Sequence, residues 1–246
     1  MSAPTEWSAP PAARELEAAL RARGDPARAE EVRRYLKSDL EHLGVNVPAL
    51  RQVAKGFVKA HPGLTRRELL ALVSSLWREP VFELRLAAVE LLALRDGLLR
   101  PEDLPLLRRL IRESGTWALV DGLAATVVGR LVERFPALAD ELDAWAEDDD
   151  FWVRRSALLA LLGPLRRGEG DFARFSRYAD GMLAEREFFI RKAIGWVLRE
   201  TGKKRPDLVY HWLEPRIGRA SGVTVREAVK YLPEDQRTRL LAAHRR

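Results

Sequence analysis

The feature that most constrains the fold is a series of short amphipathic segments, each bounded by residues that start or stop an α-helix. Asp25 stands directly before a proline, which pairs an N-capping side chain with a residue suited to the first helical turn. Thr65 and Glu68 have the spacing of a capping box. Between such signals, apolar residues recur every three or four positions, and no segment alternates with the period of a strand. The pattern predicts an all-α protein of about fourteen helices.

The spacing of these helices indicates a repeat architecture. Taken in pairs they recur at about 30 to 45 residues, which is typical of HEAT or armadillo helical hairpins. We therefore expect a curved HEAT-like helical-hairpin solenoid, formed by a single domain over residues 11–246, whose concave face suits an elongated partner. Residues 1–10 are rich in proline and serine and are expected to form a disordered tail. The helices are expected over 25–37, 46–60, 65–77, 81–95, 101–113, 117–134, 137–147, 151–163, 171–184, 187–201, 206–217, 224–232 and 233–244.

Composition excludes several classes of protein. The chain has no cysteine, so disulfides and thiolate metal sites are excluded, and its four histidines lack the spacing of a metal-binding motif. We expect neither a metal nor another cofactor. No apolar stretch reaches the roughly 18 residues of a membrane span, and the first residues do not resemble a signal peptide. These features predict a cytoplasmic protein without a membrane partner.

The positive charge of the chain is concentrated near its end. The net charge is +6, yet residues 187–246 contain fourteen Lys and Arg against seven Asp and Glu. The first 186 residues contain 28 basic and 29 acidic side chains. A basic segment of this kind suggests a polyanionic partner, although a solvated basic surface would give the same count.

The helix expected over 187–200 has two unlike faces. One face is apolar and is expected to contact the core through Ile190, Ile194 and Val197. The opposite face carries Lys192, Trp196 and Arg199, with Gly195 beside them. A tryptophan between two cations, facing away from the core, indicates a groove wall for an anionic partner. The alternative is a tryptophan that a neighbouring helix buries.

Two more helices combine the same kinds of residue. Trp117 and Asp121 are one helical turn apart at the edge of an apolar stripe. Arg155 projects from a helix that is apolar on nearly every side, so it must be paired or reach an anion. The structural alternatives are an aspartate paired with a distant arginine, and an arginine paired with one of the three aspartates just ahead of its helix.

These residues suit cleavage of the bond between a sugar and a nucleobase. That reaction builds positive charge on the sugar, which a fixed carboxylate stabilises and electron-rich tryptophan faces attract. Arginines can hold the flanking phosphates. A base that already carries positive charge, such as an N3- or N7-alkylated purine, leaves without a general acid. No Ser-His-Asp set or glycine-rich phosphate loop is present to suggest another reaction.

The segment EFFIRKAIGWVLRE resembles the signature helix of the AlkD-type DNA alkylation repair family, the HEAT-like-repeat DNA glycosylases. The segments TWALVDG and DFWVRRSALLALL occupy the places of two further motifs of that family. YLKSDLEHLGVNVPALRQ resembles its N-terminal motif, and the similarity spans residues 32–232.

The resemblance implies roles for individual residues. Trp117 and Trp196 would flank the deoxyribose of the lesion, Asp121 would stabilise the oxocarbenium ion and position water, and Arg155 would line the cleft. It further implies DNA contacts from Lys192, Arg199 and Arg154. The partner would be alkylated double-stranded DNA, bound in a concave basic DNA-binding cleft by a monomer in the bacterial nucleoid. The family excises cationic bases such as 3-methyladenine and 7-methylguanine without base flipping, and bulky natural-product adducts fit the same strategy.

Three departures from the family pattern affect the expected substrate more than the expected activity. Thr116 stands where the family often has a second aromatic residue, and Gly163-Pro164 replaces a region that is often basic. Glu41-His42 replaces an aromatic-rich segment on the side of the lesion. The alternative from another class is a HEAT-like scaffold that binds nucleic acid or protein without catalysis.

Overall fold

The computed structural model describes residues 9–245, and its regular elements are helices. Within this range the only extended pairing is one isolated parallel bridge between Glu41 and Val81. The prediction of an all-α fold is therefore confirmed. Most of the expected tail, residues 1–8, lies outside the described residues, whereas Ala9 and Pro10 already belong to the first helix. No helix among the described residues is long and apolar enough to cross a membrane.

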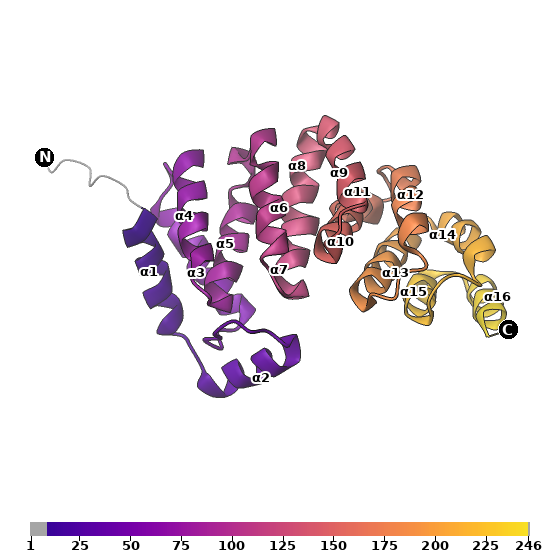
Figure 1. Cartoon of the computed structure of the whole chain (residues 1–246), viewed down its shortest axis with the longest axis horizontal. Helices are drawn as coiled ribbons and strands as arrows, with labels where there is room; N and C mark the ends of the chain where they lie inside the picture. Colours follow the sequence, from indigo (N-terminus) through magenta and orange to yellow (C-terminus); the bar gives the residue numbers. More distant parts are fainter. Residues whose placement is uncertain (1–8, 246) are drawn as a thin grey trace, which may run out of the picture. The chain divides into compact units, whose positions relative to one another are not determined.

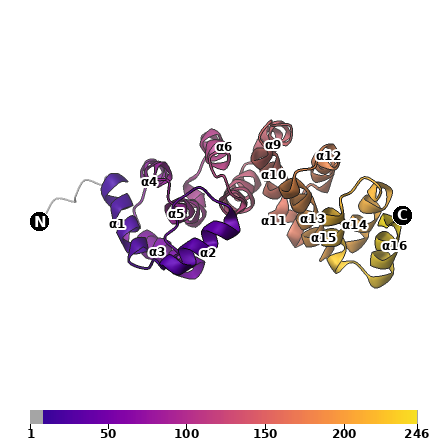
Figure 2. The same ribbon diagram turned by 60° about the horizontal axis from the view of Figure 1, so that its bottom comes forward.

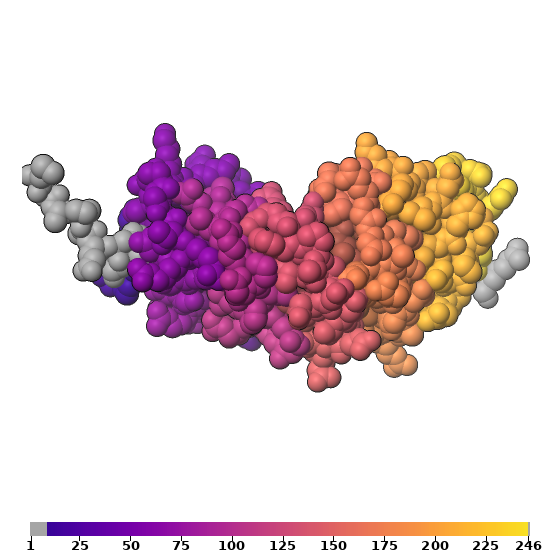
Figure 3. Space-filling view, turned by 90° about the horizontal axis from the view of Figure 1, so that it is seen from above, coloured from indigo at the N-terminus to yellow at the C-terminus, as the bar shows by residue number. Residues whose placement is uncertain are grey.

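The chain divides into two compact units, one up to Leu123 and one from Ala124 onward. We describe each unit by itself. Figure 1 labels the helices, and Figure 3 shows one face of the molecule with its side chains drawn. The elements of the first unit are α1 (Ala9–Arg21), α2 (Pro26–Leu36), α3 (Val47–Ala60), α4 (Arg66–Arg78), α5 (Phe82–Leu94), η1 (Asp96–Leu98), η2 (Pro101–Asp103), α6 (Leu104–Arg112) and α7 (Trp117–Asp121).

The π-helical element η3 (Gly122–Val128) contains the division between the units and continues α7 into α8. The expected single helix over 117–134 is thus three consecutive helical segments. The elements of the second unit are α8 (Gly129–Arg134), η4 (Pro136–Leu138), α9 (Ala139–Ala146), α10 (Phe151–Ala160), α11 (Leu162–Arg167), α12 (Phe172–Met182), α13 (Phe188–Gly202), α14 (Pro206–Leu213), η5 (Glu214–Arg216), α15 (Gly222–Ala228), η6 (Val229–Tyr231) and α16 (Glu234–His244).

The capping signals of the sequence act as expected. The Asp25 carboxylate accepts hydrogen bonds from two backbone amides at the start of α2. Thr65 and Glu68 complete a reciprocal capping box on α4. Asp150, the last of the three aspartates, caps α10. Each cap satisfies amide groups that have no partner inside the helix, so polar side chains outside the apolar pattern set the helix starts.

The expected helix over 151–163 is wrong at its end. α10 stops at Ala160, and after a turn at Leu161 the chain continues as α11, which contains Pro164. Proline is tolerated there because the first turn of a helix offers no acceptor for its missing N–H. The glycine at 168 then ends α11 in the left-handed conformation, with φ of 88°.

One helix in each unit is central. In the first unit, α5 contacts both α3 and α4, as Figures 1 and 2 show from two directions, and most of its residues are buried. In the second unit, α10 contacts α9, α12 and α13, which confirms the expectation that this apolar helix is central. α13 in turn has its most extensive packing with α15.

Candidate functional site

The candidate catalytic residues of the first unit lie on α7. Trp117 is the first residue of this helix and Asp121 the last, and both side chains are half-buried. The buried Thr116 precedes the helix. Gly122 follows it, and a Cβ atom there would lie 2.8 Å from the Val89 Cγ1 atom of α5. The absence of a side chain at Gly122 therefore lets this end of α7 approach the central helix of the unit.

A second aromatic side chain contacts Trp117. The Tyr35 ring, near the end of α2, meets the Trp117 ring edge-on with centroids 6.1 Å apart and an interplanar angle of 86°. This is a favourable geometry for an aromatic pair. Tyr35 is 72% exposed, which is unusual for so large a ring. The contact adds Tyr35 to the candidate site, where the sequence predicted only Trp117.

Asp121 lies where the backbone changes its hydrogen-bonding pattern. η3, which begins at the next residue, is a π-helix of seven residues. π-helical turns are rare and recur at functional sites, because the extra residue per turn shifts the faces of the helix. The carboxylate that the sequence analysis singled out therefore lies directly before the π-helix.

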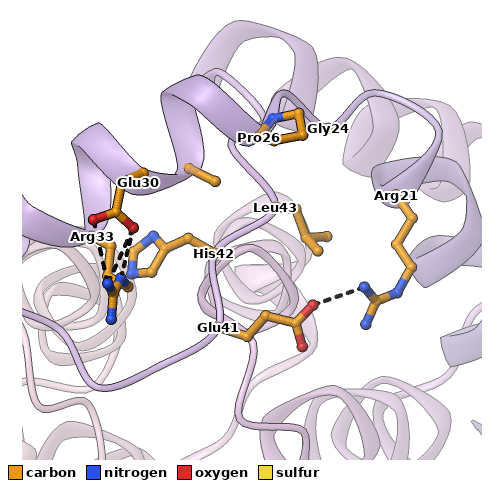
Figure 4. Close-up of a pocket in the computed structure, with 9 residues that line it drawn as sticks. Arg21, Gly24, Pro26, Glu30, Arg33, Glu41, His42 and Leu43 are labelled. Atoms are coloured by element: carbon orange, nitrogen blue, oxygen red, sulfur yellow. Dashed lines mark hydrogen bonds and ion pairs between the residues drawn. The ribbon is translucent and has the colours of Figure 1, made fainter.

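The segment before α3 shows how a departure from the family pattern is accommodated. His42 is buried and stacks on Phe82, with ring centroids 4.7 Å apart, so its imidazole fills the place of an aromatic core residue. Burial lowers the pKa of His42, and neither ring nitrogen makes a hydrogen bond within the described chain. Glu41 pairs with Arg21 at 2.9 Å beside a pocket of about 490 Å³. Figure 4 shows this pocket between α2 and the segment that carries His42.

The two arginines of α10 have different surroundings. Arg155 is 2% exposed, donates a hydrogen bond to the backbone oxygen of Phe189 and lies 5.9 Å from the centroid of that ring. Arg155 therefore contacts the start of α13. Arg154 forms a bidentate pair with Glu185, at 3.0 and 2.9 Å, and also donates to two backbone oxygens ahead of α10. These bonds give Arg154 a structural role that the sequence did not predict.

The polar face of α13 is partly covered by α15. Gly195 is buried against α15, and a Cβ atom there would lie 2.7 Å from the Cβ atom of Glu227 and 3.0 Å from the backbone oxygen of Thr224. The missing side chain lets the two helices pack closely. The expectation that this face points away from the core is therefore wrong around Gly195. Trp196 is half-buried.

The two cations of this face share one carboxylate. Lys192 donates to Glu227 at 2.8 Å, and Arg199 donates to its other oxygen. Lys230 contacts the same carboxylate at 2.8 Å. Burial alone would raise the pKa of Glu227, but the hydrogen bonds from Lys192 and Lys230 and the charge of Arg199 lower it to about 2. Glu227 is thus ionised at neutral pH and orients both candidate phosphate contacts.

The structure therefore groups the predicted residues within each unit. Trp117 and Asp121 share α7, with Tyr35 against the tryptophan. Lys192, Trp196 and Arg199 share α13, and Arg155 contacts the same helix. The residues missed by the sequence analysis are Tyr35 and Glu227. Tyr35 is far in the chain from Trp117, and Glu227 is far from Lys192 and Arg199, so no local pattern could have revealed these contacts.

These observations define an all-α helical-repeat protein that displays aromatic, carboxylate and arginine side chains on several of its helices. A family model of DNA alkylation repair enzymes matches residues 16–232, and the chain belongs to this family. A comparison with curated protein sequences gave no match.

Solved structures share the fold. The predicted DNA alkylation repair enzyme from Enterococcus faecalis is 22% identical, with a TM-score of 0.78 over 86% of this chain and 98% of that one. AlkD2 from Streptococcus mutans is 18% identical, with a TM-score of 0.64 over 92% and 99% of the two chains. The smu.31 protein from Streptococcus mutans is 19% identical, with a TM-score of 0.58 over 76% and 93%.

Proposed function

We propose that this DNA alkylation repair protein is a DNA glycosylase that removes positively charged N3- and N7-alkylated purines from duplex DNA. The observation that carries the proposal is the pairing of a half-buried tryptophan and a half-buried carboxylate one helical turn apart, Trp117 and Asp121, in a chain of this family. The reaction is hydrolysis of the N-glycosidic bond, the first step of base excision repair.

The chemistry follows from how charge develops. As the bond to the base breaks, the deoxyribose gains oxocarbenium character. Asp121 would stabilise this charge and position the attacking water, since a preorganised charge in a partly desolvated site is worth more than one in bulk water. The faces of Trp117 and Trp196 would cover the sugar, because aromatic rings attract cationic groups. The alkylated base leaves as a neutral molecule and needs no proton donor.

The enzyme would need no pocket for a flipped base. A cationic base can leave while it remains stacked, provided that the sugar is held between aromatic side chains. The substrate range would then include bulky cationic purine adducts, as in self-resistance to natural-product alkylators. We propose a monomer that acts on chromosomal DNA in the cytoplasm, with Lys192 and Arg199 at the DNA backbone and no metal or other cofactor. The buried Arg155 would act indirectly, by holding the start of α13.

The substrate class can be tested by release of free bases from duplex DNA at neutral pH. We expect 3-methyladenine and 7-methylguanine to be released, and neutral lesions such as O6-methylguanine or uracil to remain. Trp117→Ala should slow release of the alkylated bases. Trp145 is buried in the core, so its substitution would disturb the fold and cannot serve as the control. Phe172→Ala, at the start of α12, is a better aromatic control.

Three outcomes are informative. Release of methylated bases alone supports a repair glycosylase for small lesions. Release of bulky cationic adducts in preference to methylated bases supports the same chemistry with a self-resistance role. If neither kind of base is released while DNA is bound, the protein is a non-catalytic nucleic-acid-binding scaffold and the proposal fails.

A further inference from the structure

A second buried carboxylate continues the contact between α13 and its neighbours. Glu200 is 5% exposed and accepts hydrogen bonds from Arg199 at 3.2 Å and from Lys203 at 2.8 Å. Arg166 of α11 approaches it at 3.0 Å. Burial on its own would raise the pKa of Glu200, but these cations lower it. Arg199 therefore links Glu200 to Glu227, and the two carboxylates form one network.

We call this network the Glu200–Glu227 ladder. Its cations are Arg166, Lys192, Arg199, Lys203 and Lys230. Five cations on two carboxylates leave a net charge of three positive units. The side chains of the two carboxylates are only 6% and 9% exposed, whereas those of the three lysines are 37 to 49% exposed. The surface of the ladder is consequently cationic, and its anions lie beneath.

The geometry leaves donors for a ligand. A lysine ammonium has three N–H groups and an arginine guanidinium has five. The hydrogen bonds of the ladder occupy only some of these N–H groups. The same bonds fix the direction of long side chains, which would otherwise lose conformational entropy when a ligand binds. Cations that are preorganised in this way and still exposed suit a partner with closely spaced negative charges.

An exposed aromatic ring extends the ladder. Tyr231, at the end of η6, is 52% exposed, and the Lys203 Nζ atom lies 4.8 Å from the centroid of its ring. Within the described residues its hydroxyl group makes no hydrogen bond. No packing requirement explains the exposure of the Tyr231 ring.

We propose that Lys203, Lys230 and Tyr231 form a second backbone-binding segment for duplex DNA, beyond the contacts of Lys192 and Arg199. This inference rests on the proposed function in taking DNA as the partner. The lysines would contact successive phosphates, and the tyrosine hydroxyl would donate to a phosphate oxygen, as tyrosines commonly do at DNA backbones.

The dimensions suit this partner. Lys192, Trp196 and Arg199 follow one face of α13, and Lys203, the residue just after the helix, continues it; the spacings are four, three and four residues. At about 1.5 Å per residue, this face extends about 16 Å. Duplex DNA carries a charge about every 1.7 Å of its axis, or every 3.4 Å on one strand, so the ladder is long enough to contact several phosphates.

The test is the binding of the full chain to a short undamaged duplex at several salt concentrations. Lys203→Ala with Lys230→Ala should weaken binding and reduce the magnitude of the salt slope by about two, or about one per lysine. Tyr231→Phe should weaken binding a few-fold, and Tyr231→Ala should weaken it further because the ring that orients Lys203 is also lost. Arg237→Ala is the matched control: it removes one exposed charge from α16, outside the ladder, and should leave the slope unchanged.

The variants should remain folded, because Glu200 keeps Arg166 and Arg199 and Glu227 keeps Lys192 and Arg199. Thermal unfolding checks this. If wild-type protein binds the duplex and the double variant has the same affinity and salt slope, the ladder inference is wrong while the proposed glycosylase is untouched. If the wild type binds no DNA, the proposed function itself fails. If the wild type binds DNA but releases no alkylated base, and the double variant has a reduced salt slope, only the glycosylase proposal fails.

Discussion

Gly195→Ala should destabilise the second unit, even though alanine is a better helix former than glycine. The new Cβ atom would lie 2.7 Å from the Glu227 Cβ atom, 3.0 Å from the Thr224 oxygen and 3.2 Å from the Thr224 Cα atom. Two of these three atoms belong to the backbone of α15, so no rotation of a flexible side chain relieves the contact. α15 must shift, or α13 must bend.

The expected magnitude is the difference of two effects. Overpacking of a close helix contact costs about 1–3 kcal/mol. The gain in helix propensity from glycine to alanine is about 1 kcal/mol. Because the clash is with backbone, we place the cost near the upper end and expect a net loss of about 1–2 kcal/mol in the free energy of unfolding. A shift of α15 should also weaken the hydrogen bonds from Lys192 and Arg199 to Glu227.

The assay is urea unfolding followed by circular dichroism, with Gly181→Ala as the control in the same unit. Gly181 lies in the last turn of α12, and no heavy atom would contact its Cβ within 4 Å. The control should therefore leave stability unchanged or raise it by up to about 1 kcal/mol. If Gly195→Ala is as stable as the wild type, the close packing of α13 on α15 is not a constraint and the argument is refuted.

Three further predictions concern stability and the first unit. The pKa of Glu227 is about 2, below its unfolded value, so its stabilisation is complete above about pH 4.5 and is lost as the pH falls toward 2. Glu227→Gln should lower the free energy of unfolding at pH 7 by about 1–2 kcal/mol, allowing for screening at the exposed cations. The variant should also lose less stability than the wild type as the pH falls. Urea titrations that show the same pH dependence for both proteins would contradict this. Thr65→Ala should lower the free energy of urea unfolding by about 1 kcal/mol, because it removes the cap of α4. A loss below about 0.2 kcal/mol would argue against the capping box. Tyr35→Ala should slow base release by loosening Trp117 while leaving the melting temperature nearly unchanged, because the Tyr35 ring is mostly exposed; equal rates would remove Tyr35 from the site.

Local signals predicted the helices well because caps and apolar periodicity act within one or two turns. Asp25, Thr65 and Asp150 marked helix starts correctly. The same logic placed Trp117 and Asp121 on one helix, one turn apart. It failed at Pro164, since a proline in the first turn of a new helix and a proline that ends one have the same local sequence.

Contacts between distant residues could not be predicted. A helical wheel placed Gly195 on the polar face, but whether that face is covered depends on α15, about thirty residues later. Arg154 and Arg155 are adjacent in the sequence, yet one pairs with Glu185 and the other contacts Phe189. The sequence was enough to predict which types of residue form the site. Their contact partners could be identified only from the three-dimensional structure.

The central claim is that Asp121 stabilises the developing charge on the sugar. The most direct measurement is single-turnover release of 7-methylguanine from duplex DNA by the wild type and by Asp121→Asn, with DNA affinity measured on the same samples. Asp235→Asn, an identical change at an exposed position of α16, is the control. Loss of one preorganised electrostatic interaction should slow release by roughly 100-fold or more while affinity changes only a few-fold. Equal rates for the wild type and Asp121→Asn would contradict the account.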